Sequence, residues 1–378
     1  MKVFTFTFLV SYFLCSSALD NGLGLLPPMG WNSWYNFSCH FNQSMVEQTA
    51  DVIIQKGLDK LGYTYVCLDD CWAKSRDSNN VVQPDPQAFP DFQGMIDYVH
   101  SKGLKFGLYS DAGTMTCAHR PGSLGYEEVD ANTYAKWKVD FLKYDNCNNN
   151  GIPSQKRYTA MRDALNKTGR PIFYSLCSGG AEGVATWGAT IGNMWRTAAD
   201  IGYPWDNMIN RADRNDKVAK YAGPGGWNDP DMLQAGNHGM THVEYQTQFS
   251  LWSLMKSPLL IGTDLRNIDD ESLRILTNPE VIAINQDKMG VQGTKRKTDG
   301  TNEVWVGPLD GGAYAVILLN RGTATANITA SWSDFGVDPS KEAGVRDLWQ
   351  MKDLGSMKGS VIATVPSHGV AMYKITPE

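Results

Sequence analysis

The sequence has few of the features that mark nucleic-acid-binding or metal-dependent proteins. Among its 378 residues the longest run of Lys or Arg is residues 295–297, and the formal net charge is −6. This charge balance argues against an electrostatic surface for nucleic acid. The six histidines follow no metal-ligand spacing, and the sequence contains neither a GxSxG motif nor a Walker loop. We therefore expect a neutral or weakly charged small-molecule substrate and no nucleic-acid partner.

Long apolar runs are also scarce, and the one at the N-terminus is short. Lys2 precedes an apolar run over residues 3–15, and Ser16-Ser17-Ala18 supplies small residues suited to cleavage. This pattern predicts a signal peptide over residues 1–18. A membrane anchor is the alternative, but the run is shorter than the roughly 20 residues that span a bilayer. We expect entry into the secretory pathway, ending outside the cell or in the lysosome, and no membrane span.

Cysteine is infrequent, and one of the seven, Cys15, lies in the predicted signal peptide. The remaining six are Cys39, Cys67, Cys71, Cys117, Cys147 and Cys177. An even number permits disulfides in an oxidising compartment, but spacing alone does not choose the pairs. Zinc is disfavoured because CLDDC has no second ligand pair at a suitable spacing. Four N-glycosylation sequons, which also fit secretion, begin at Asn36, Asn42, Asn166 and Asn327.

Eight short, β-prone apolar runs each end at a polar or acidic cluster, at nearly regular intervals. The ends fall at Trp34, Asp70, Asp111, Asp145, Cys177, Asp200, Asp231 and Asp264. Stretches with helical spacing lie between them, at 45–58, 92–104, 134–141, 158–165, 208–221, 245–255 and 273–284. Alternating strands and helices in this number predict a (β/α)8 TIM barrel over residues 19–288. Chemistry in such a barrel occurs at the C-terminal ends of the strands.

The pattern changes after Gln286. Short strand-like runs occur at 303–309, 313–320, 327–335, 345–349 and 369–375, without helical stretches between them. These runs predict a second, small antiparallel β domain, a sandwich, over residues 289–378. No internal repeat other than the strand and helix alternation is present.

Two of the strand-end acids, Asp145 and Asp200, are the candidates for bond breaking. Lys143 lies two residues before Asp145 and hence on the same face of a strand, where its charge favours an ionised carboxylate suited to nucleophilic attack. An acid with a raised pKa, here Asp200, could protonate a leaving group, and two such carboxylates perform retaining glycoside hydrolysis. The alternative for each is a helix N-cap.

Other strand-end residues have the composition of a sugar site. The doubled Asp69-Asp70 and the isolated Asp231 could grip hydroxyl groups. Trp34 and Tyr109 could pack on a sugar ring. For Trp31, Trp195 and Trp227 we expect core packing instead, and for Asp111 and Asp264 a structural role.

The motifs MGWNSW, LDDCW, FGLYSDAG, LKYDNC, WRTAADI, GGWNDPDML, SPLLIGTD and NQD, in this order, resemble glycoside hydrolase family 27. This family comprises α-galactosidases and α-N-acetylgalactosaminidases, and the resemblance covers almost the whole mature chain. It implies a TIM barrel followed by an antiparallel β domain, and a retaining double displacement that uses no cofactor and no metal. The implied substrate is an oligosaccharide or other galactoside with terminal α-galactose, and the expected assembly is a homodimer.

The resemblance also assigns roles to residues of this chain. It implies that Asp145 is the nucleophile and Asp200 the acid/base. The implied substrate-binding residues are Trp34, Asp69, Asp70, Tyr109, Cys117, Lys143, Cys177, Ser178, Arg196, Asp231 and Met232. Asp69 and Asp70 correspond to residues that grip O4 and O6, and Arg196 and Asp231 to residues on the O2 and O3 side. The implied disulfides are Cys39 with Cys71 and Cys117 with Cys147, which leaves Cys67 and Cys177 free.

One stretch departs from the family pattern. Cys177 is followed by Ser178-Gly179-Gly180-Ala181, where secreted plant and fungal α-galactosidases usually carry an acidic or amide residue and then Trp-Gly. Ser178 and Ala181 instead resemble the loop of the α-N-acetylgalactosaminidases. We expect galactose as the substrate, with N-acetylgalactosamine as the alternative. A β-L-arabinopyranosidase is disfavoured by the retained Asp69-Asp70 pair, and a catalytically inactive carbohydrate-binding barrel by the retained Asp145 and Asp200.

Overall fold

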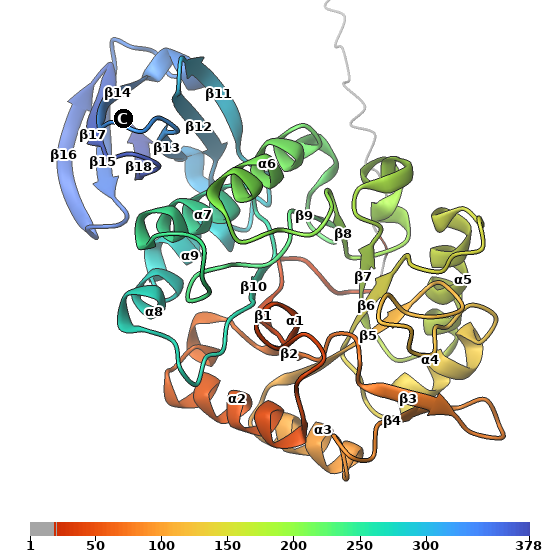
Figure 1. The fold of residues 1–378 in the computed structure, drawn as a ribbon. Coiled ribbons are helices and arrows are strands. Elements are labelled where there is room, and N and C mark those ends of the chain that lie inside the picture. The colour runs from red at the N-terminus through yellow and green to blue at the C-terminus, as the bar shows by residue number, and fades with distance from the viewer. Residues whose placement is uncertain (1–18, 20) are drawn as a thin grey trace, which may run out of the picture.

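The computed structural model describes Leu19 and residues 21–378, so the predicted signal peptide over 1–18 lies outside the described residues. The larger part of the chain is a parallel sheet of eight strands in the order β10-β1-β2-β5-β6-β7-β8-β9, surrounded by helices (Figure 1). The strands are β1 (Met29–Asn32), β2 (Tyr65–Cys67), β5 (Lys105–Asp111), β6 (Phe141–Asp145), β7 (Phe173–Cys177), β8 (Met194–Arg196), β9 (Trp227–Asp229) and β10 (Leu259–Ile261). The predicted TIM-like barrel is therefore confirmed.

The barrel closes between β9 and β10, and the contact there differs from the other strand pairs. β1 pairs with both β2 and β10, in parallel. Between β9 and β10 the contact is a single bridge beyond the end of β9, in which Leu233 N–H donates to Leu260 O at 2.8 Å and Leu233 O accepts from Gly262 N–H at 3.1 Å. The chain just after β9 thus completes the ring on the side where the strands end.

The helical layer follows the prediction at five of its seven stretches. The helices are α2 (Gln43–Gln55), α3 (Phe92–Ser101), α4 (Glu127–Lys136), α5 (Ser154–Lys167), α6 (Trp205–Asp216), α7 (His242–Leu254), α8 (Asp270–Leu276) and α9 (Pro279–Asn285). The expected helix over 134–141 is wrong, because α4 ends at Lys136 and Lys138 has a positive φ. The expected helix over 273–284 is two helices. Asn278 caps the second one and Pro279 begins it.

The connection between β7 and β8 has no α-helix. Two 3₁₀ segments, Ala181–Thr186 and Gly188–Thr190, occupy it. The regular alternation of strand and helix is broken there, in the loop that departs from the family pattern. A hairpin of β3 (Ala73–Arg76) and β4 (Val82–Pro84) is inserted after β2.

The inward and outward faces of the strands bury different aromatic residues. Phe141 and Phe173 stack inside the barrel at 5.0 Å between ring centroids, and Tyr65 and Trp227 pack in the same inner cluster. Trp31 and Trp195 belong to the larger cluster between the sheet and the helices. The core packing predicted for Trp31, Trp195 and Trp227 is confirmed. The inner aromatic cluster forms a floor, because Lys143 and Asp145 follow Phe141 on the same strand face.

The C-terminal part is an antiparallel β domain, as predicted. Its main sheet has the order β11-β12-β13-β18-β15-β16, and β14 pairs with β17. The strands are β11 (Thr294–Asp299), β12 (Asn302–Pro308), β13 (Tyr314–Asn320), β14 (Ala326–Ser331), β15 (Glu342–Asp347), β16 (Lys352–Lys358), β17 (Ser360–Val365) and β18 (Val370–Pro377). The predicted boundary at 288 falls between α9 and β11.

The β domain lies against the helical layer near α6, α7 and α9 (Figure 1). The ring of His368, before β18, stacks on Trp205 at 4.3 Å and forms a 2.6 Å hydrogen bond to Glu244 of α7. Trp349 donates to Ser250 of the same helix at 2.9 Å. Within residues 19 and 21–378, no helix is both long and apolar enough to cross a membrane.

Candidate active site

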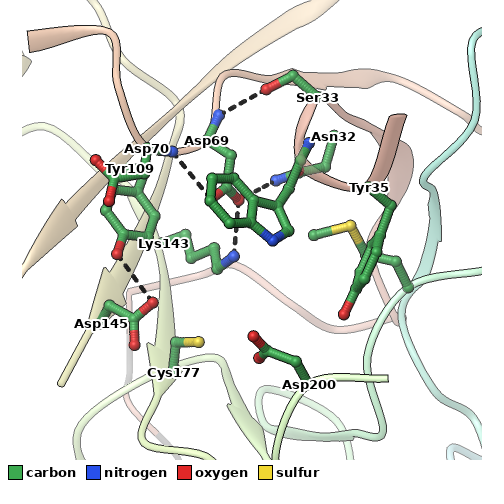
Figure 2. Close-up of polar contacts among 12 residues, drawn as sticks. Asn32, Ser33, Tyr35, Asp69, Asp70, Tyr109, Lys143, Asp145, Cys177 and Asp200 are labelled. Carbon is green, nitrogen blue, oxygen red and sulfur yellow. Dashed lines mark hydrogen bonds and ion pairs between the residues drawn. The ribbon is translucent and has the colours of Figure 1, made fainter. Parts of the chain in front are cut away.

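The C-terminal ends of seven barrel strands bring the predicted site residues together. β1 is followed by Trp34, β2 by Asp69 and Asp70, β7 by Ser178, β8 by Asp200 and β9 by Asp231 and Met232, while Tyr109, Lys143, Asp145, Cys177 and Arg196 lie within β5 to β8. Figure 2 shows acidic side chains around Lys143, which lies near the centre of the group. Cys117 is exposed on the rim, in the loop after β5.

Asp69 accepts hydrogen bonds from three directions and is nearly inaccessible to solvent. Lys143 Nζ lies 2.7 Å from its Oδ2, and Asn32 Nδ2 donates to the same oxygen at 2.9 Å (Figure 2). The N–H of Asp70 donates to its Oδ1 at 2.9 Å. The ammonium of Lys143 therefore pairs with Asp69, and Asp69 is held in one orientation.

The neighbouring Asp70 is held by backbone groups instead. Its Oδ1 accepts from Cys71 N–H at 2.6 Å and its Oδ2 from Ala118 N–H at 2.8 Å. Burial raises the pKa of Asp70, and these two N–H donors oppose that rise.

Asp145 is held by one side chain and one backbone group. Tyr109 donates its hydroxyl to Oδ2 at 2.9 Å, and the N–H of Asn146 donates to Oδ1 at 2.8 Å. Burial raises the pKa of Asp145, and the nearby Lys143 charge lowers it without cancelling the rise. The charge of Lys143 therefore favours the ionised form of Asp145, as its place on the strand predicted, while burial opposes that form.

Asp200 has the opposite tendency. Its side chain is 72% exposed, and Arg196 Nη2 lies 3.2 Å from Oδ1. The surrounding walls desolvate Asp200 and raise its pKa, but the charges of Arg196 and Lys143 outweigh this, so that the pKa lies below its usual value. The raised pKa expected for this acid is therefore not present in the unliganded site. The residue responsible, Arg196, is four positions earlier in the chain, and its guanidinium reaches Asp200 from the end of β8.

The same guanidinium also holds Asp231. Arg196 Nη2 lies 2.7 Å from Asp231 Oδ2, which also accepts from Tyr35 OH at 2.6 Å and from Ile201 N–H at 2.8 Å. Both Arg196 and Asp231 are buried, at 3% and 2% exposure. Asp231 has a φ of 86°, in the left-handed region that non-glycine residues rarely adopt. Its contacts hold it in this conformation.

Cys177 and Ser178 form the wall between the two catalytic candidates. Figure 2 shows the thiol of Cys177 between the carboxyl groups of Asp145 and Asp200, and Arg196 Nη1 lies 3.7 Å from the sulfur. Burial raises the pKa of this thiol. Ser178 is 6% exposed, and its Oγ has no hydrogen-bond partner among the described residues. Small residues therefore line this side of the site.

Packing explains one of those small residues. Gly180 has a φ of 81°, and a Cβ on it would lie 2.5 Å from the carbonyl oxygen of Thr197. No larger residue fits without moving that backbone. A Cβ on Gly179 would meet only ordinary contacts. The close approach of the two loops thus requires Gly180, but it does not account for Ser178 or Ala181.

The two disulfides are the pairs that the resemblance implied. Cys39 is bonded to Cys71 and Cys117 to Cys147, while Cys67 and Cys177 are free and buried. In the described part of the chain, one group of possible metal ligands lies within 4.8 Å, namely Asp111, Cys117, Asp145 and Cys147. Its two sulfurs are joined in the second disulfide and cannot bind as thiolates.

The remaining predicted residues are Asp111, beside Asp145, and Asp264 and the four sequon residues. Asp111 is fully buried and accepts from Gly113 N–H at 2.6 Å and Cys147 N–H at 3.0 Å. Asp264 pairs with Arg266 at 2.8 Å. Both have the structural surroundings that were expected of them. The four sequon residues Asn36, Asn42, Asn166 and Asn327 are exposed, and Asn42 also caps α2.

Three residues of the site were missed in the sequence. Asn32 donates to Asp69, and Ser33 Oγ accepts from Asp69 N–H at 3.0 Å (Figure 2). Tyr35 donates to Asp231. Asn32 and Ser33 lie at the end of the first barrel strand, and Tyr35 lies in the short helix after it. The polar pair Asn32-Ser33 directly after an apolar strand is the signal that could have identified the first two. Nothing in the local sequence connects Tyr35 to an acid 196 positions away.

Comparison with known proteins is consistent with this geometry. Residues 26–287 match the family model described as Alpha galactosidase A, and residues 299–375 match the Alpha galactosidase C-terminal beta sandwich domain. The chain is 55% identical to an α-galactosidase of Coffea arabica, over 96% of this chain and 97% of that protein. It is 50% identical to α-galactosidase 2 of Arabidopsis thaliana, over 98% and 95%.

A solved structure gives the same result. The crystal structure of α-galactosidase I from Mortierella vinacea superposes with a TM-score of 0.91 at 40% identity, covering 94% of this chain and 98% of that one. Both domains and the order of their elements are thus shared with known members over almost the full length. The chain belongs to the α-galactosidase family of glycoside hydrolases, which confirms the resemblance seen in its motifs.

Proposed function

We propose that this protein is a retaining α-galactosidase that removes terminal α-linked galactose from galactosides. One observation carries the proposal. Asp145 presents a carboxylate that Tyr109 and the N–H of Asn146 orient, on the inward face of a strand, and the exposed Asp200 lies across Cys177 from it (Figure 2). A fixed carboxylate opposite a solvent-accessible one is the arrangement that double displacement needs.

The reaction follows from those two groups. Asp145 attacks the anomeric carbon while Asp200 gives a proton to the departing oxygen, which yields a covalent β-galactosyl enzyme and the free alcohol. Asp200 then takes a proton from water, and the water oxygen displaces Asp145 from the anomeric carbon. Two inversions give α-galactose with net retention.

The two carboxyl groups differ in their surroundings. Burial raises the pKa of Asp145, and the charges of Arg196 and Lys143 lower the pKa of Asp200. Attack requires Asp145 ionised and Asp200 protonated. A bound sugar displaces water from Asp200 and raises its pKa, which favours the protonated acid that the first step uses.

The other site residues are suited to bind the sugar. Asp69 and Asp70 are oriented acceptors for hydroxyl groups, and Lys143 is a donor beside them. Trp34 and Met232 supply apolar walls. Arg196 and Ser178 lie on the remaining side, where Ser178 Oγ is buried and has no hydrogen-bond partner among the described residues. This side decides between galactose and N-acetylgalactosamine, so the purified protein should be assayed on the aryl α-glycosides of both sugars, with faster hydrolysis of the galactoside expected.

Azide distinguishes the roles of the two acids. In Asp145→Ala, azide should replace the missing nucleophile and convert an activated aryl α-galactoside to the β-galactosyl azide. In Asp200→Ala, azide should attack the β-galactosyl enzyme and give the α-galactosyl azide. Asp264→Asn is the matched control at a strand end and should keep full activity. The same anomer from both variants, or undiminished activity of Asp145→Ala, would contradict the assignment.

The destination of the protein is a separate proposal. We infer entry into the secretory pathway from the N-terminal leader pattern, the four exposed sequons and the two disulfides. N-terminal sequencing of the mature protein should begin at or near Leu19, and enzymatic deglycosylation should increase its electrophoretic mobility. An intact N-terminus and unchanged mobility would refute this.

A further inference from the structure

One oxygen of Asp231 has three polar partners. Its Oδ2 accepts hydrogen bonds from Ile201 N–H at 2.8 Å and from Tyr35 OH at 2.6 Å, and it forms an ion pair with Arg196 Nη2 at 2.7 Å. Its Oδ1 accepts from Met232 N–H at 2.9 Å. Two of these donors are backbone groups that any residue would supply. The chain therefore adds Tyr35 to an oxygen that already has a charged partner.

Tyr35 is held firmly in the position from which it makes this bond. It lies in the short helix α1 (Trp34–Phe37), and its carbonyl accepts from Tyr203 OH at 2.9 Å. The ring of Tyr203 packs edge-on against it at 6.3 Å between centroids. Behind it, a Cβ at Gly262 would come within 3.3 Å of the Tyr35 Cβ. Burial and the charge of Asp231 raise the pKa of the phenol, so it stays protonated and acts as a donor.

Arg196 divides one nitrogen between two carboxylates. Its Nη2 lies 2.7 Å from Asp231 and 3.2 Å from Asp200. A carboxylate oxygen whose negative charge is partly stabilised by a hydroxyl donor attracts the guanidinium less strongly. The bond from Tyr35 to Asp231 thus leaves more of the positive charge of Arg196 for Asp200.

We propose that Tyr35 is a positioning residue for the acid/base: by donating to Asp231 its hydroxyl releases Arg196 toward Asp200 and so sets how tightly Asp200 holds its proton. The inference rests on the proposed function, because it assigns a role relative to the acid/base Asp200. It identifies a residue outside the bond-breaking pair that tunes the pH range of the enzyme.

Several charged or titratable groups also face Asp200, but they are less suitable for substitution than Tyr35. They are Arg196 from β8, Lys143 from β6, Cys177 from β7, Arg211 from α6 and Asp231 after β9. Changing any of these alters a charge or a wall of the site. Replacing Tyr35 by Phe removes one oxygen, keeps the ring, and leaves the net charge unchanged.

The test is the pH dependence of kcat/KM for an aryl α-galactoside. In Tyr35→Phe, Asp231 should draw Arg196 closer and Asp200 should hold its proton to higher pH. We expect the limb of the profile that reports Asp200 to move up by about 0.5 pH unit, the size that partial loss of one charge-assisted bond produces. The other limb should stay in place. A purely structural role would lower the rate at every pH and move neither limb.

Tyr203→Phe is the matched control, since it removes a hydroxyl that bonds to the backbone of Tyr35 but touches neither carboxylate. It should leave both limbs unmoved, and thermal unfolding should show that both variants are folded. In an Asp200→Asn background, Tyr35→Phe should no longer move a limb. An unmoved or downward-shifted limb in Tyr35→Phe, or an equal shift in Tyr203→Phe, overturns the proposal. Activity of the unaltered enzyme on the same substrate tests the proposed function independently.

Discussion

Removing the ammonium of Lys143 should destabilise the protein far more than removing a similar surface ammonium. Lys143 and Asp69 form a 2.7 Å ion pair whose side chains are 13% and 3% exposed. In Lys143→Met, Asp69 keeps only Asn32 and one backbone N–H as donors. Breaking a buried ion pair by removing one partner costs about 3 to 5 kcal/mol. For a barrel of this size that corresponds to a fall in Tm of roughly 5 to 9 °C.

A second lysine ion pair, on the surface, provides the control. Lys102 pairs with Asp51 at the same 2.7 Å, but both side chains are about one-third exposed. Lys102→Met should change Tm very little, because water screens surface pairs. The double variant Lys143→Met/Asp69→Asn should lose less than the sum of its single variants, by about 2 kcal/mol or more. Circular dichroism melts measure all four proteins. Additive losses, or equal shifts for the two lysines, would refute this reasoning.

Two further predictions concern buried charges away from the reacting groups. Burial raises the pKa of Asp111 to about 8, and the charge of Asp145 adds to this rise. The protonated Asp111 therefore stabilises the folded protein fully below pH 4, and this stabilisation is lost as the pH rises through 8. Melts across this range should show the native protein losing stability relative to Asp111→Asn, by at most about 1.4 kcal/mol per pH unit; parallel curves would contradict this. Burial lowers the pKa of Lys256 to about 8. Burying the charged ammonium therefore destabilises the folded protein below pH 8, and this destabilisation disappears as the pH rises to about 10.5. Lys256→Met should therefore raise Tm at pH 6 and raise it less at pH 10, and a lower Tm at pH 6 would show that the bond to the carbonyl of Ile284 dominates.

The barrel could be predicted because its strands are buried on both faces. Such strands are continuous apolar runs, and each ends where the chain reaches the polar rim, as β6 does at Asp145. Among the strands that were missed, β11 and β16 have mostly exposed side chains and therefore no apolar signal. The helix boundaries near Lys138 and Asn278 depend on single backbone positions, which periodicity over a window does not resolve.

The positions of the site residues were accessible from sequence, but their electrostatics were not. A residue at a strand end faces the site by topology alone, so Asp145, Asp200 and Asp231 could be named. The preference of Lys143 for Asp69, and the sharing of Arg196 between two acids, are set by distances between strands that are remote in the chain. The directions of the pKa shifts of Asp145 and Asp200 follow from those distances and from burial, and they required coordinates.

Both disulfides lie at the catalytic end of the barrel, and the described residues form none elsewhere. Cys71 follows Asp70 directly, Cys147 lies two residues after Asp145, and Cys117 precedes the N–H that binds Asp70. Reduction would release these loops while the strand ladder and the helical layer kept their hydrogen bonds. Protein produced in a reducing cytoplasm could then give a native circular dichroism spectrum and a compact elution profile but turn over poorly. Recombinant preparations should accordingly be judged by free-thiol titration together with activity, since spectroscopic foldedness does not report the state of the rim.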